Sequence, residues 1–181
     1  MIKSRVIFFT LILIAVIALA CSSGGTNTVS EADITGLQKY VQQATPKLDT
    51  FEARHKEMMR QIGSSLHQGP NKNYQYDRET VLGQTAKMRG DLDNMRQDFR
   101  AMTLPKSAES FAGNIMQLIV NEMVFIDKLD TTFKAENQEI SEGVWAGLAA
   151  NAQLIPYQKS RLVSEMQRVS GATQNANARG K

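Results

Sequence analysis

Apolar residues recur at alternating intervals of three and four along most of the chain, the spacing that gathers them on one face of an α-helix. The pattern begins near residue 30 and predicts four long helices, with breaks at residues 68–73, at 103–106 and before Ser141. The inner positions of the first helix are Ile34, Leu37, Val41, Ala44, Leu48, Phe51, His55, Met58 and Ile62. Ser30 is its expected N-cap. Pro46 either kinks this helix or starts a new one, and the unbroken spacing favours a kink.

The later helices repeat the same spacing. The second, with Asp77 as its expected N-cap, has the inner positions Val81, Thr85, Met88, Leu92, Met95, Phe99 and Met102. Those of the third are Ala108, Phe111, Ile115, Leu118, Glu122, Phe125, Leu129 and Thr132, widened by Ala112, Ile119, Ile126 and Phe133. The fourth should start near Ser141, bend at Pro156 and bury Val144, Leu148, Asn151, Ile155, Leu162, Met166 and Val169. Residues 171–181 are small and polar, and we expect a disordered tail there.

No stretch of alternating β-branched residues bounded by turn signals occurs, so the sequence predicts no strands. Helices of about 28 to 36 residues joined by short connections favour antiparallel neighbours. We therefore predict an all-α fold for residues 30–170, an elongated antiparallel up-down four-helix bundle with coiled-coil-like seams. The alternative is a helical hairpin that completes its core as a homo-oligomer, because heptads this regular also pair between chains.

The N-terminus has the order of a secretory signal. Lys3 and Arg5 precede the apolar run of residues 6–19, and Ala20 stands before Cys21, the only cysteine of the chain. A run of roughly 14 residues is short of the roughly 20 that span a bilayer, although an uncleaved anchor is the alternative. Residues 22–28 are polar and rich in Gly and Ser, as in a flexible tether.

This order resembles the lipobox of bacterial lipoproteins. The resemblance implies that residues 1–20 are a signal peptide removed on export, and that Cys21 is acylated and joined through a tether, residues 21–29, to the bundle. Ser22 resembles outer-membrane sorting in a Gram-negative cell, with the protein facing the periplasm. The resemblance ends near residue 28 and says nothing of the helical domain.

Charge and cysteine content narrow the function classes. Lys3 and Arg5 account for much of the net charge of +3, so the chain after the signal is nearly neutral. No basic block with interleaved aromatic residues remains, and we expect no nucleic-acid partner. A single cysteine allows no intramolecular disulfide, so stability must come from a packed core.

Three polar residues, His55, Glu122 and Asn151, lie at inner positions. With the helices aligned as a bundle, the three fall within roughly 5 Å of one level along the axis. One interpretation is a hydrogen-bonded polar layer that fixes helix register. The others are that some of these side chains face solvent, or that they form a ligand or metal site.

The metal interpretation has limited support. Met58, Met88, Met95 and Met123 could reach the same interior, and thioether with imidazole suits copper or haem iron. Methionine is also an ordinary filler of helical cores, and no Cys-x-x-Cys-His or repeated Glu-x-x-His motif occurs. We therefore expect no cofactor and no metal. No nucleophile elbow occurs either, and we expect no enzyme.

The fourth helix has a face of small residues that includes Gly143 and Gly147. Glycine weakens a helix, so a close backbone approach is the expected reason for it. The first interpretation is tight packing inside the bundle. The alternative is a groove for a partner helix with Trp145 as its anchor. Together these features predict a membrane-anchored envelope lipoprotein with a non-enzymatic protein-binding or structural domain. The alternative is a small-ligand or metal-binding bundle, holding haem or copper, that uses His55.

Overall fold

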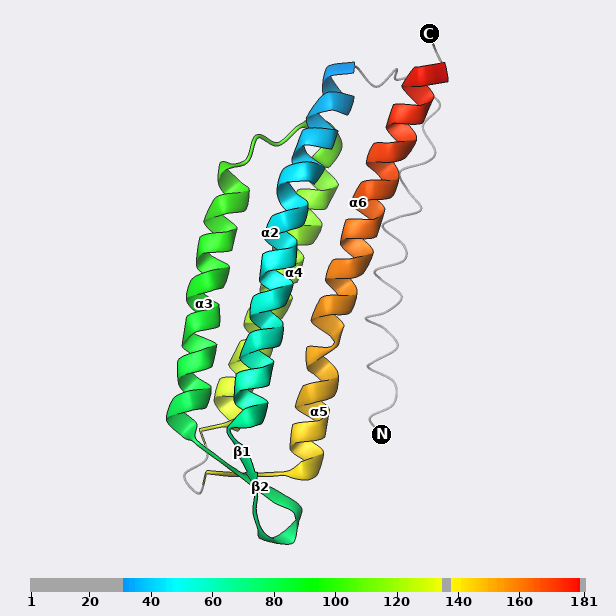
Figure 1. The fold of residues 1–181 in the computed structure, drawn as a ribbon. Helices are drawn as coiled ribbons and strands as arrows, with labels where there is room; N and C mark the ends of the chain where they lie inside the picture. The colour runs from blue at the N-terminus through cyan, green and yellow to red at the C-terminus, as the bar shows by residue number, and fades with distance from the viewer. Residues whose placement is uncertain (1–30, 135–137, 180–181) are drawn as a thin grey trace, which may run out of the picture.

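The protein is predominantly helical, with a small three-stranded sheet at one end (Figure 1). The computed structural model describes residues 31–134 and 138–179, with side chains as far as residue 172. The helices are α2 (Glu31–Ser64), α3 (Arg78–Ala101), α4 (Glu109–Thr132), α5 (Glu142–Ala152) and α6 (Leu154–Arg179). Short 3-10 turns span Pro70–Lys72 and Lys106–Ala108. The predicted N-cap Ser30, Cys21 and the predicted signal segment, residues 1–20, lie outside the described residues.

The long helices lie side by side along one axis (Figure 1). α2 packs against α3 and α6, and α4 packs against the same two helices from the other side. Ion pairs join Lys47 to Asp98 and Arg54 to Asp91, so residue numbers run in opposite directions along α2 and α3. One apolar core extends between the helices, from Leu37 on α2 to Met166 on α6.

The first helix follows its predicted pattern throughout. All nine inner positions of α2 are buried, and Tyr40 is buried beside them. α2 continues through Pro46 without ending, which confirms that this proline starts no new helix. Asp77 caps α3 by accepting a hydrogen bond from the Glu79 amide, as predicted.

The prediction that the chain has no strands was wrong. β1 (Leu66–Gln68) and β2 (Asn73–Tyr76) form an antiparallel hairpin, and β3 (Glu139–Ser141) pairs antiparallel with β2. Tyr76 packs edge-on against Phe133 with ring centroids 4.8 Å apart, so the sheet closes the core at this end. Strands of three or four residues are too short to give an alternating pattern, which is why the sequence did not reveal them.

The fourth predicted helix is two helices. Ser141 caps α5 by accepting a hydrogen bond from the Val144 amide. α5 ends at Ala152 and α6 begins at Leu154, so the helix is interrupted at Gln153, three residues before Pro156. Val144, expected inside, is 44% exposed, and Asn151 is only half-buried. α6 continues to Arg179, past Gly171, where we had expected regular structure to end.

Candidate functional site

A buried acid–base pair lies between α2 and α4. His55 Nδ1 is 2.8 Å from Glu122 Oε1, and the two side chains are 2% and 0% exposed. The ring of Phe125 lies beside the imidazole, with the centroids 5.9 Å apart. Both residues sit at inner positions of their helices, which is why the three–four spacing brings them into the core. The pair is therefore enclosed by apolar side chains, where an unpaired charge is costly.

The other ring nitrogen of His55 bonds to the backbone of α5. Nε2 is 3.0 Å from the carbonyl oxygen of Ala152. A carbonyl oxygen only accepts hydrogen bonds, so Nε2 must carry a hydrogen and donate it. The contact between Nδ1 and Oε1 then needs one more proton, held either by the imidazole or by the carboxyl group. In both forms the pair is neutral overall, because its two groups share this single proton.

Proline explains why the Ala152 carbonyl needs a donor. In a continuous helix that carbonyl would accept from the amide of residue 156. Pro156 has no amide hydrogen, so the carbonyl loses its helical partner. His55 supplies the missing hydrogen bond from across the bundle. The pair thus joins α2 and α4 to the end of α5, at the point where α5 gives way to α6.

Glu122 is not fully satisfied. Its second carboxyl oxygen, Oε2, is buried and has no hydrogen-bond partner among the described residues. Buried polar atoms without a partner are uncommon and costly in native proteins. The contact with His55 is therefore the main interaction that compensates Glu122 for leaving water.

The other residues of the predicted site are placed differently. Asn151 was expected as the third member of the polar layer, but His55 bonds instead to the carbonyl of its neighbour, Ala152. Asn151 itself is half-buried. Gly143 and Gly147 lie on the exposed face of α5, and a methyl group added at either would meet no atom within 4 Å. The expectation that this face packs inside the bundle was therefore wrong. Trp145 turns the other way, toward Gly63 on α2.

Lys159 is a buried polar residue that the sequence analysis missed. It follows Ile155 by four positions and precedes Leu162 by three, so its place on the inner face was visible in the spacing. Its ammonium group contacts Asp49 and Glu52 of α2, the latter at 2.9 Å. Burial lowers the pKa of Lys159, but hydrogen bonds to these two carboxylates outweigh it and leave the pKa raised. Lys159 therefore fastens α6 to α2 near the His55 level.

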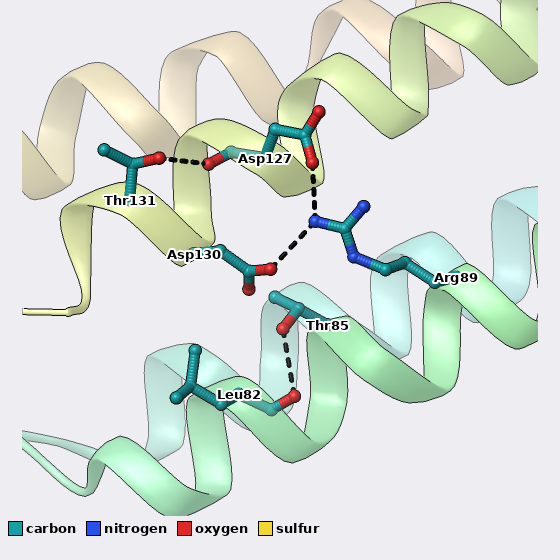
Figure 2. A network of polar contacts seen from close by, with 6 residues as sticks. All are labelled: Leu82, Thr85, Arg89, Asp127, Asp130 and Thr131. Carbon is teal, nitrogen blue, oxygen red and sulfur yellow. Dashed lines mark hydrogen bonds and ion pairs between the residues drawn. The ribbon is translucent and has the colours of Figure 1, made fainter.

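A second ion-pair cluster fastens α3 to α4 on the outside of the bundle. Figure 2 shows Arg89 between Asp127 and Asp130, with distances of 2.6 and 2.8 Å to the two carboxylates. Hydrogen bonds to Asp130 and Asp127 raise the pKa of Arg89. The hydroxyls of Thr85 and Thr131 donate hydrogen bonds to backbone carbonyls of their own helices, not to the carboxylates of the ion pair (Figure 2). This cluster links α3 to α4, and within the described residues the second carboxyl oxygen of Asp130, Oδ1, is buried without a hydrogen-bond partner.

A surface groove of about 300 Å³ lies between α2 and α3. Met58 and Met88 line it, together with Arg54, Glu57 and Lys87, but His55 and Glu122 do not. Of the four methionines considered for the alternative metal site, Met58 and Met88 line this groove and His55 does not. Both nitrogens of His55 are also already hydrogen-bonded. Across residues 31–134 and 138–179, no group of three or more His, Cys, Asp and Glu side chains could hold a metal ion.

Comparisons with protein-family models, with curated proteins and with solved structures find no match for this chain. Among the helices within the described residues, none is long and apolar enough to cross a membrane. The interpretation of the site therefore depends on the geometry of the molecule itself.

Proposed function

We propose that the protein is an exported lipoprotein anchored by acylated Cys21, and that its helical domain is a non-enzymatic module that binds another protein of the cell envelope or supports an assembly there. The domain is an elongated antiparallel up-down four-helix bundle. In a Gram-negative cell it is held at the outer membrane and faces the periplasm. The lipobox-like sequence of residues 6–21 supports the anchor.

The exposed face of α5 is the observation that supports a protein partner. Gly143, Val144, Gly147 and Ala150 are all exposed, with Leu154 following at 52% exposure. Gly147 lies in the interior of α5, where glycine costs an isolated helix roughly 1 kcal/mol relative to alanine, and no contact within the described residues accounts for that cost. A helix packed on this face would account for it, because small residues let two backbones approach closely.

The long axis of the bundle supports the same proposal. α2 begins ten residues after Cys21 and is about 51 Å long at 1.5 Å per residue. α5 lies beside the C-terminal end of α2 (Figure 1). If the lipid on Cys21 holds the start of α2 near the membrane, the α5 face lies away from the membrane surface, where another protein can reach it.

Lipidation is tested by mass spectrometry of the protein extracted from its native membranes. The N-terminal peptide should begin at Cys21 and carry acyl chains. The Cys21→Ser variant should keep its signal and lose the acyl mass. Recovery of an intact Met1 in the mature wild-type protein would overturn the anchor.

Binding is tested by affinity capture from native membranes with a matched pair of variants. Gly147→Gln fills the α5 face, whereas Gly90→Gln places the same side chain on α3, where an added carbon also meets open space. We expect both variants to fold as the wild type does by circular dichroism. A specific partner should be retained by Gly90→Gln and lost by Gly147→Gln. Equal capture by both variants would remove α5 from the proposal.

A small-ligand or metal binder is the competing class. Metal analysis and an absorption spectrum of protein purified from its native envelope separate the two. A stoichiometric metal or a Soret band would favour ligand or metal binding over protein binding as the function of the domain. The hydrogen bonds on both nitrogens of His55 are the geometric reason for placing this class second.

A further inference from the structure

α5 is attached to the bundle more lightly than the other helices. Of its eleven residues only Leu148 and Ala152 are buried, with Trp145 half-buried against Gly63. It is bounded by β3 at its start and by the break at Gln153 at its end. Few buried contacts and an interrupted helix are the features of segments that open locally before the whole protein unfolds.

We infer that His55 and Glu122 form a latch that holds the end of α5 on the bundle, and that α5 opens as a unit when this latch is broken. The latch consists of the two side chains and the carbonyl of Ala152. Its contacts join three separate parts of the chain, α2, α4 and α5, through one imidazole ring.

The chemistry of the ring explains why a histidine is used. An imidazole has two nitrogens on opposite edges, so it can meet Glu122 and Ala152 at once. The Nε2 hydrogen replaces the amide hydrogen that Pro156 withholds. Without it the Ala152 carbonyl would be buried with no partner at the point where α5 ends, and detaching α5 would let water reach that carbonyl.

Glu122 is a positioning residue in this arrangement. It contacts Nδ1 and therefore fixes the rotation of the ring, which aims Nε2 and its hydrogen at the Ala152 carbonyl. Its second oxygen has no partner, so the carboxyl group is held mainly through the histidine. A glutamine at 122 could still serve, because its amide can donate to Nδ1 while Nε2 donates to Ala152. A leucine could not.

The inference is independent of lipidation and of any partner. If the proposed function holds, the latch sets the position of the face that carries Gly147. If the proposed function fails, the latch can still be measured in the isolated protein, so the two can fail separately.

The test is hydrogen exchange, followed by mass spectrometry, on the purified full-length chain. His55→Leu and Glu122→Leu should speed exchange of the α5 amides by about tenfold or more relative to those of α2 and α3. Glu122→Gln should leave α5 exchange close to the wild-type rate. A uniform rise over all helices, with no excess in α5, would overturn the latch.

Pro156→Ala supplies the decisive rescue. Gln153 already has near-helical backbone angles, φ −68° and ψ −17°, so an alanine at 156 can donate its amide to the Ala152 carbonyl without a large rearrangement. Added to His55→Leu, this substitution should return α5 exchange toward the wild-type rate.

The matched control is Leu92→Ala, a core truncation on α3. Pro156→Ala should not repair its effect on α5. Equal rescue of Leu92→Ala and His55→Leu would contradict the latch. So would the absence of rescue in the His55→Leu background. If His55→Leu does not fold, Glu122→Leu with and without Pro156→Ala gives the same comparison.

Discussion

Gly36 on α2 faces Pro105, the residue before the 3-10 turn that leads into α4, at close range. A methyl group added at Gly36 would lie 3.0 Å from Cβ of Pro105, closer than ordinary van der Waals contact, so the proline or the helix would have to shift. We expect Gly36→Ala to destabilise the protein by about 1–2 kcal/mol despite the better helix propensity of alanine. Urea denaturation followed by circular dichroism measures the change.

Gly90→Ala is the control for that prediction. It also lies within a helix, but an added methyl meets no atom within 4 Å. The substitution should raise the free energy of unfolding by up to about 1 kcal/mol. A gain of stability in Gly36→Ala as large as that in Gly90→Ala would show that Pro105 does not restrict this site.

The hairpin between α2 and α3 contains a strained lysine. Lys72 has a φ of 57°, a left-handed conformation that disfavours side chains, and its neighbour Asn71 has the same φ. Asparagine tolerates this conformation better than lysine does. We expect Lys72→Gly to stabilise the protein by about 1 kcal/mol and Asn71→Gly to stabilise it less. A loss of stability in Lys72→Gly, measured by the same urea denaturation, would contradict the left-handed conformation of Lys72.

The ion pairs of Lys159 make the free energy of unfolding depend on pH in the alkaline range. Its pKa is raised above the ordinary 10.5 by Asp49 and Glu52 despite burial. A raised pKa in the folded state adds stability that is fully present below 10.5 and is lost as pH rises through the folded value. Lys159→Met should therefore lower the free energy of unfolding near pH 7 by about 1 kcal/mol or less, because Asp49 is well exposed.

The gap between wild type and Lys159→Met should close above pH 10.5, as the wild-type lysine loses its proton. Urea melts at a series of pH values measure it. Lys56→Met is the control, since this lysine also contacts Glu52 but its side chain is 63% exposed. A gap that widens with pH would have the wrong sign for this interaction.

The buried ring itself can be observed by NMR. We expect the nitrogen spectrum of His55 to show a hydrogen on Nε2 throughout the pH range in which the protein is folded, because the Ala152 carbonyl can only accept. Nitrogen-15 shifts of labelled histidine distinguish the two ring positions. A spectrum with Nε2 unprotonated would mean that the contact with Ala152 is not a hydrogen bond.

The three–four spacing of apolar residues predicts the buried positions correctly where a helix has a regular inner face. The inner positions of α2 were all correct, including polar His55, because position on a helix decides burial more strongly than residue type does in a long amphipathic segment. The same reasoning brought His55 and Glu122 to one level. It could not show that the third partner is the carbonyl of Ala152, although Pro156, four residues later, marks that carbonyl as lacking a donor.

The errors have physical causes. Val144 follows the spacing but lies in the first turn of a short helix, where it is exposed, whereas Ile140 just before the helix is buried and Trp145 is half-buried. The strands are held by pairing across distant segments, as between Tyr74 and Ile140, and no local pattern reports such a partner. Lys159 is at an inner position although lysine is usually exposed, because its long stem can be buried when carboxylates meet its ammonium group.

The placement of the start of α2 and the end of α6 has a mechanical consequence. The start of α2 and the far end of α6 lie at the same end of the molecule, and the sheet lies at the other (Figure 1). Tension between a membrane anchor before α2 and a load on the end of α6 would therefore peel these helices apart turn by turn, instead of shearing all their contacts together. Peeling would reach the ion pairs of Lys159 before the contact of His55 with Ala152, and the strand pairing of β2 with β3 would be loaded last.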